Sequence, residues 1–256
     1  MKRTLLFALP FLAVSLCSGQ TTAPAAAGTQ QAPTPPDLQK QLDRDERVLH
    51  DYGNLARYRD DDAKLPPPAA GENRVVFMGD SITDNWGHKI GPFFPGKPYV
   101  NRGISGQVTS QMLLRFRPDV INLQPKVVVI LAGTNDIGGN MGPASDEMIE
   151  GNLASMADLA RANNIKVVLA SLTPVCDYHQ PQTAKRPPDR ILAINAWITK
   201  YAADHGIVVL NYFPHMIDDK GMFRAELTAD GLHPNAAGYE IMAPLAEEAI
   251  SKALQQ

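Results

Sequence analysis

Five short, almost continuously apolar runs most constrain how this chain of 256 residues can fold; they are residues 75–78, 99–101, 127–132, 167–172 and 207–212. A run that does not alternate with polar residues is typical of a strand buried on both faces, as in a parallel sheet. Between and after these runs, apolar side chains recur at helical spacing over residues 148–159, 191–202 and 239–250. Because helices that join parallel strands cover both faces of the sheet, the sequence predicts an α/β fold. Its expected form is a three-layer α/β/α sandwich around a five-stranded parallel sheet.

The segment before the first apolar run divides into three parts of different composition. Residues 1–19 start with Lys2 and Arg3 and continue into an apolar run of 12 residues, 5–16. That run is too short to cross a bilayer and is typical of a signal peptide, with cleavage after Gly19. A lipoprotein anchored at Cys17 is the alternative. We therefore expect an exported protein, periplasmic or extracellular, without stable membrane insertion.

Residues 20–36 contain only Ala, Pro, Thr, Gln and Gly, which predicts a low-complexity linker. In residues 37–71, large apolar side chains from Leu38 to Tyr58 recur at steps of three, four and seven. This spacing predicts one face of a helix over residues 37–60, in a helical extension that packs on the domain of residues 72–256.

Composition narrows the function further. Hydrophobic residues make up 44% of the chain, enough for a sizeable core, and the net charge is −3. A nucleic-acid-binding protein usually carries a basic excess, so no nucleic acid partner is expected. Two cysteines are too few for a disulfide scaffold, and after cleavage only Cys176 remains, most simply as a small buried apolar residue.

Polar, glycine-rich loops follow the predicted strands, at the sheet edge where open α/β sheets bind ligands. Ser81 lies in Gly79-Asp80-Ser81-Ile82, as a helix cap or a nucleophile, and Asn135 lies in Gly133-Thr134-Asn135-Asp136. In residues 230–234, Asp230 precedes His233 by three positions and can accept its Nδ1–H, leaving Nε2 free. Taken alone, each loop is equally explained as a turn or a cap.

The four blocks GDSI at 79–82, NRGISG at 101–106, GTND at 133–136 and DGLHP at 230–234 occur in this order. In this the chain resembles the SGNH hydrolases, the GDSL-type serine esterases and lipases, over about residues 72–254. The run from Asn101 to Asp136 is also similar to the platelet-activating-factor acetylhydrolase-like branch of that superfamily.

The resemblance implies a flavodoxin-like sandwich with Ser81 as nucleophile, His233 as general base and Asp230 as the group that orients it. It implies an oxyanion hole made by the N–H groups of Ser81 and Gly103 and the side chain of Asn135. Such a site needs no metal or cofactor. Asp177, Tyr178 and His179, which follow the fourth predicted strand, are further candidates for substrate binding.

The expected substrate is a small-molecule or glycan ester with a short, acetyl-type acyl group, of a carbohydrate or an aryl alcohol. Three alternatives stay open: a lysophospholipase or lipid-ester hydrolase, an acyltransferase using the same acyl-enzyme, and a non-catalytic binding module on the same fold. The sequence does not indicate an oligomeric state.

Overall fold

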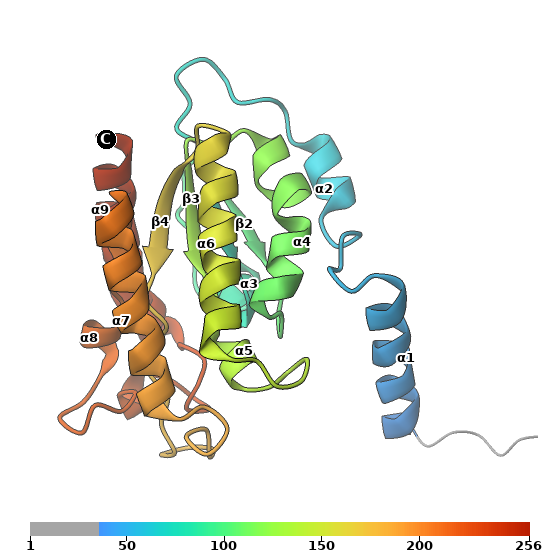
Figure 1. Cartoon of the computed structure of the whole chain (residues 1–256), viewed down its shortest axis with the longest axis vertical. Helices are drawn as coiled ribbons and strands as arrows, with labels where there is room; N and C mark the ends of the chain where they lie inside the picture. The colour runs from blue at the N-terminus through green and yellow to red at the C-terminus, as the bar shows by residue number, and fades with distance from the viewer. Residues whose placement is uncertain (1–35) are drawn as a thin grey trace, which may run out of the picture. The chain divides into compact units, whose positions relative to one another are not determined.

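The computed structural model describes residues 36–256 (Figure 1). The predicted signal peptide, Cys17 and all but the last residue of the predicted linker lie outside this range. The chain divides into two compact units, Met1–Gln41 and Leu42–Gln256. Helix α1, Pro36–His50, begins in the first unit and ends in the second. All of the remaining elements belong to the second unit.

The second unit is built on a five-stranded sheet that is parallel throughout and has the strand order β2-β1-β3-β4-β5. Its strands are β1 Val75–Gly79, β2 Tyr99–Gly103, β3 Val127–Leu131, β4 Lys166–Ala170 and β5 Val208–Leu210. The central strands β1 and β3 are buried at every position, as continuous apolar runs require. Gly79 lies in register with both Gly103 and Leu131, so the carboxyl ends of the three neighbouring strands are level.

Helices cover both faces of this sheet and complete the predicted three-layer α/β/α sandwich. One layer holds α4 Thr109–Asp119, α6 Asp146–Ala162 and α7 Pro188–His205, which lie together on one face in Figure 1. The other layer holds α3 Ser81–His88 and α9 Ala236–Leu254. Short helical turns fill the connections: η1 Ile121–Leu123, α5 Thr134–Ile137, α8 Phe213–Met216 and η2 Ala225–Leu227. Among the helices of residues 36–256, none combines the length and apolar character needed to cross a bilayer.

The single helix expected over residues 37–60 is wrong in its extent. Helix α1 ends at His50, and a second helix, α2 Arg59–Lys64, follows only after a series of turns. The carboxylate of Asp51 accepts the N–H groups of Leu55 and Ala56 at 2.8 and 2.9 Å, and Asn54 has a φ of 52°. An aspartate that binds the following backbone in this way favours a turn over a continued helix.

Cys176 is fully buried and free, as a small apolar residue of the core. It lies just after β4, and its N–H donates to the carbonyl of Gly231 at 2.9 Å.

Candidate active site

Ser81 is the first residue of α3 and follows β1 after a single residue, Asp80. The Asp80 carboxylate caps the helix by accepting the Ile82 N–H at 2.9 Å. Asp80 is only 1% exposed, and this burial raises its pKa to about 6 against the opposing effect of the Ile82 hydrogen bond. Ser81 is 8% exposed, and its Oγ is held at the end of the sheet where the predicted site lies.

Ser81, His233 and Asp230 form one hydrogen-bonded chain, although Ser81 and Asp230 lie 149 positions apart in the sequence. The Ser81 Oγ lies 2.8 Å from His233 Nε2, and His233 Nδ1 lies 2.6 Å from Asp230 Oδ2. A carboxylate only accepts hydrogen bonds, so Nδ1 carries the proton toward Asp230. In the neutral imidazole, Nε2 is then the acceptor, and the Ser81 hydroxyl donates to it.

The Asp230 carboxylate is fixed by its own backbone turn. Burial acts to raise its pKa, but hydrogen bonds from the His233 ring and from the N–H groups of His233 and Leu232 outweigh burial, so the pKa of Asp230 lies below its usual range. Gly231 has a φ of 81°, and a Cβ at this position would lie 2.3 Å from the Cys176 carbonyl oxygen. Only glycine therefore fits between the Asp-His turn and the loop after β4.

The structure corrects the oxyanion role expected of Gly103. Its N–H donates to Asn101 Oδ1 at 2.8 Å, and Gly103 does not line the cleft that contains Ser81. Gly106, three residues later and with a φ of 82°, does line that cleft. Within the described residues, neither the Gly106 N–H nor the Ser81 N–H has a protein acceptor. The N–H of Gly106 replaces that of Gly103 as the candidate donor.

The Asn135 side chain lies beside Asp80 in the same cleft, and its amide is oriented by its neighbours. Its Oδ1 accepts from Asn140 Nδ2 at 2.9 Å and from the Arg186 guanidinium at 3.3 Å. Its Nδ2 donates to the Gln107 carbonyl at 3.0 Å and faces Asp80 Oδ2 at 3.4 Å. The N–H side of the amide is thus turned away from Arg186, as an oxyanion donor at this end of the sheet requires.

Ser81, His233, Gly106 and Asn135 line one cleft of about 1030 Å³. A nucleophile and a base in this cleft, a carboxylate that orients the base, and unpaired N–H groups are the parts that acyl transfer needs. No group of three or more His, Cys, Asp or Glu side chains in residues 36–256 is arranged to hold a metal ion.

A model of the GDSL-like Lipase/Acylhydrolase family matches residues 77–241, which include Ser81, Asn135, Asp230 and His233. The chain belongs to this family.

Three proteins similar to this chain have names that agree with this assignment. A crystal structure of a GDSL-like lipase from Bacteroides thetaiotaomicron is 43% identical, with a TM-score of 0.74, and the match covers 79% of this chain and 99% of that one. Esterase TesA of Pseudomonas aeruginosa is 31% identical over 138 residues, 54% of this chain and 62% of TesA. An acetylxylan esterase of Xylanibacter ruminicola is 24% identical over 241 residues, 80% of this chain and 47% of the esterase. The chain thus spans about half to three fifths of the length of these two curated relatives.

The other predicted site residues of this GDSL-like chain lie elsewhere. Asp177 accepts the N–H groups of Gln182 and Thr183 at 2.6 and 2.9 Å. Tyr178 donates to Asp218 at 2.6 Å, and His179 Nε2 lies 3.0 Å from the Ala225 carbonyl. None of the three lines the cleft of Ser81. They hold the loop after β4 in shape instead, because each side chain is already used within that loop and its neighbours.

Sequence reasoning missed Arg186, Asn140 and Gly106 at the GDSL-like site. Gly106 lies inside the NRGISG block, so the block itself was the signal, but the pattern does not show which of its two glycines has a free N–H. Arg186 lies 16 residues after β4 (186 − 170), next to Pro187, where no pattern marks it.

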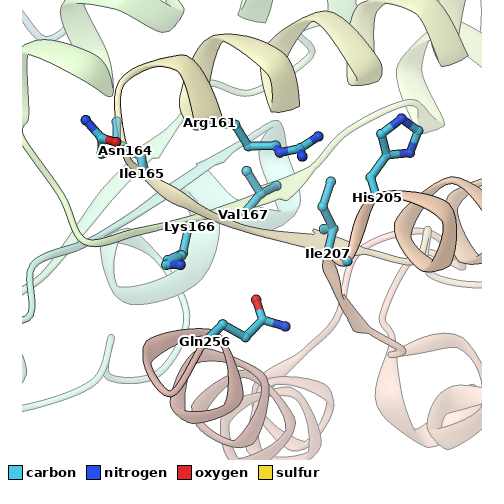
Figure 2. Close-up of a pocket in the computed structure, with 9 residues that line it drawn as sticks. Arg161, Asn164, Ile165, Lys166, Val167, His205, Ile207 and Gln256 are labelled. Atoms are coloured by element: carbon cyan, nitrogen blue, oxygen red, sulfur yellow. The ribbon is translucent and has the colours of Figure 1, made fainter.

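A second hollow, of about 540 Å³, lies at the opposite edge of the sheet, where β4 begins. Figure 2 shows Arg161, Lys166, His205 and Gln256 around it. Its lining contains no serine, cysteine or carboxylate side chain, so it offers no nucleophile with a base.

Proposed function

We propose that this chain is an exported serine ester hydrolase that works through an acyl-enzyme. The observation that carries the proposal is the unbroken chain from Ser81 Oγ through the His233 ring to Asp230, with links of 2.8 and 2.6 Å. A serine hydroxyl is a weak nucleophile until a neighbouring base removes its proton, and His233 Nε2 is placed to do so. Family membership supports the same class of reaction.

In the proposed reaction, Ser81 Oγ attacks the ester carbonyl while His233 takes its proton. The carbonyl oxygen gains negative charge and accepts from the N–H groups of Ser81 and Gly106 and from Asn135 Nδ2, which gives up its 3.4 Å contact with Asp80 to reach it. Collapse of this intermediate expels the alcohol, which receives the proton from His233. Water then enters, His233 removes its proton, and hydrolysis of the acyl-enzyme releases the acid and restores Ser81. Asp230 stabilises the imidazolium in both halves.

For the substrate, we propose short, acetyl-type esters of carbohydrates or aryl alcohols. The relative that covers most of this chain among those above is named an acetylxylan esterase, which supports an acetylated carbohydrate. Export, predicted from residues 1–19, fits a substrate outside the cytoplasm. A lipid ester is the second candidate, because a structure 43% identical to this chain is called a lipase.

Hydrolysis of 4-nitrophenyl esters from acetate to palmitate tests both proposals. Wild type should cleave acetate or butyrate fastest, and Ser81→Ala should be inactive on every ester. A preference for long chains would move the substrate to lipids. A serine-independent rate would overturn the mechanism. Because the mechanism uses only groups of the chain, treatment with EDTA should leave the rate unchanged.

A further inference from the structure

The segment Asp51–Lys64 precedes the family-matched residues 77–241 but reaches the active site. Asp51, Tyr52, Asn54 and Ala56 line the same cleft as Ser81 and His233, together with His50 at the end of α1. One wall of the cleft is therefore made by chain outside the matched family region. The family model, which matches residues 77–241, does not include this wall.

The first half of the segment is bound to the start of α4 and to the loop before it. Gln107 Nε2 donates to the Gly53 carbonyl at 2.9 Å, and Gln111 Nε2 donates to the Tyr52 carbonyl at 2.7 Å. The Tyr52 hydroxyl lies 2.9 Å from Ser110 Oγ. Both the backbone and the ring of Tyr52 are held in place by these contacts.

The second half is bound to the end of β2. The Tyr58 side chain is 2% exposed, and its hydroxyl donates to the Gly103 carbonyl. The guanidinium groups of Arg57 and Arg102 each lie 4.6 Å from the centre of its ring. Arg102 also forms an ion pair with Asp62 in α2 at 2.5 Å, with both side chains largely buried. A segment with two buried anchors of this kind has a fixed position relative to the cleft.

The first half of the segment also contacts the loop that carries the candidate oxyanion donor Gly106. Gln107, which binds Gly53, also accepts the Asn135 amide through its carbonyl at 3.0 Å, and it follows Gly106 directly. A group bound against the wall is thus held at a fixed distance from the reacting carbonyl.

We propose that Asp51–Lys64, with His50, is the specificity-determining wall of the active site, and that its rings bind the ring of the alcohol part of the ester. Tyr52 and His50 are the ring side chains of the wall that line the cleft, and both are exposed. Among the described residues that line the cleft, Asp51 is the only acid, and its carboxylate already accepts the N–H groups of Leu55 and Ala56. Flat faces next to polar groups suit a sugar or aryl ring better than a flexible acyl chain. The inference rests on the proposed hydrolase function.

The test compares cyclohexyl acetate with ethyl acetate on the full chain, because the two alcohols leave with similar chemistry and differ in the ring. In Tyr52→Ala and in His50→Ala, the loss of kcat/KM should be about tenfold larger for the ring ester than for ethyl acetate, mainly through KM. Tyr52→Phe keeps the ring and should keep the discrimination. Tyr201→Ala is the matched control, because Tyr201 is half-buried on α7 and does not line the cleft.

Equal losses on both esters would overturn the inference, and so would a changed preference among acyl chain lengths with the ring preference intact. His50→Ala keeps the test decisive if Tyr52→Ala does not fold, because His50 is exposed. The hydrolase proposal fails separately: in that case wild type and Ser81→Ala would cleave ethyl acetate at the same rate.

Discussion

At the residue scale, the orientation of the Asn135 amide depends on Arg186. The two ends of an amide have nearly the same shape, so only the partners decide which end faces the cleft. Arg186 is 4% exposed and can only donate, to the Thr134 carbonyl at 3.2 Å and to Asn135 Oδ1 at 3.3 Å. Its charge therefore holds Oδ1 on its own side and directs Nδ2 away from itself.

We expect Asn135→Ala to lower kcat by roughly 10²–10³, the usual cost of one lost oxyanion donor. Arg186→Gln introduces an acceptor at this position, lets the amide rotate, and should lower kcat in the same direction by a smaller factor with KM little changed. Arg186→Lys, which still only donates, should recover most of that loss. Kinetics of 4-nitrophenyl acetate hydrolysis check this, and losses that multiply in Asn135→Ala/Arg186→Gln would contradict the dependence.

The buried Asp80 carboxyl, next to Ser81, makes the free energy of unfolding depend on pH. Its folded pKa of about 6 lies above the ordinary value of 3.8, because burial disfavours the charged form. The stability that comes from protonated Asp80 is present below pH 3.8 and is lost as the pH rises through 6. A shift of this size corresponds to about 3 kcal/mol.

Asp80→Asn keeps a helix cap and removes the buried charge. Its free energy of unfolding should exceed that of wild type by up to about 3 kcal/mol at pH 8, and the difference should shrink toward zero near pH 4. Urea unfolding at both pH values measures the effect. The exposed Asp219→Asn should stay within about 0.5 kcal/mol of wild type at both. A variant less stable than wild type at pH 8 would show that Asp80 makes a stabilising ionic contact instead.

The residue scale also shows what a sequence pattern leaves open. Ser81, Asp230 and His233 could be predicted because four blocks in the right order resemble a known family, and the structure brings the three side chains together. The sequence does not show whether Gly103 or Gly106 is the oxyanion donor. The Gly103 N–H is bound to Asn101 Oδ1, and this contact exists only in the folded loop. Asp177 and Tyr178, which were expected to bind substrate, stabilise a loop instead, through partners up to 40 residues away in the sequence.

At the scale of elements, α4 is fixed to the sheet by one buried arginine. Arg115 is fully buried and donates to the carbonyls of Gly79 and Arg102 at 3.0 and 2.8 Å, at the ends of β1 and β2. It also binds Gln107 Oε1 at 2.5 Å and forms an ion pair with Asp119 at 2.9 Å. The Arg115 guanidinium therefore connects α4 with the ends of β1 and β2 and with the loop that contains Gly106 and Gln107.

Arg115→Met should lower the free energy of unfolding by about 3–5 kcal/mol, because it leaves the Asp119 carboxylate buried without its partner. Arg115→Met/Asp119→Leu should be more stable than the single variant, since the unpaired charge is gone. Urea denaturation of the two variants against wild type decides this. If the double variant is the less stable of the two, the carbonyl contacts of Arg115 outweigh its ion pair.

Elements whose apolar residues follow a clear pattern could be predicted from the sequence, whereas an element end that depends on a local turn could not. All five predicted strands are present, and their ends differ from the apolar runs by two residues at most. The helix that was expected over residues 37–60 ends at His50 instead, because Asp51 and Asn54 form a turn. The spacing of the apolar residues gives no sign of this turn.

At the scale of the whole molecule, the charge of the cleft is opposite to that of the chain. The chain carries a net charge of −3, but the cleft is lined by Lys89, Lys185 and Arg186 against the single acid Asp51. Both Asp51 oxygens are already bound to backbone N–H groups. A cleft of one sign concentrates field lines and attracts ligands of the other sign even when the whole surface does not.

We therefore expect an ester that carries a carboxylate to be cleaved faster, relative to its neutral counterpart, at low ionic strength. The pair 4-acetoxybenzoate and 4-acetoxybenzamide has nearly the same shape and differs in the charge of one group. The ratio of their kcat/KM values should fall as salt rises from about 0.01 to about 1 M, where the screening length drops from about 30 to about 3 Å. Lys89→Ala and Lys185→Ala should lower the ratio at low salt, whereas Lys252→Ala, on the exposed side of α9, should not. A ratio that is constant with salt would mean that the three cations are screened from the substrate, and the preference would then have to come from shape alone.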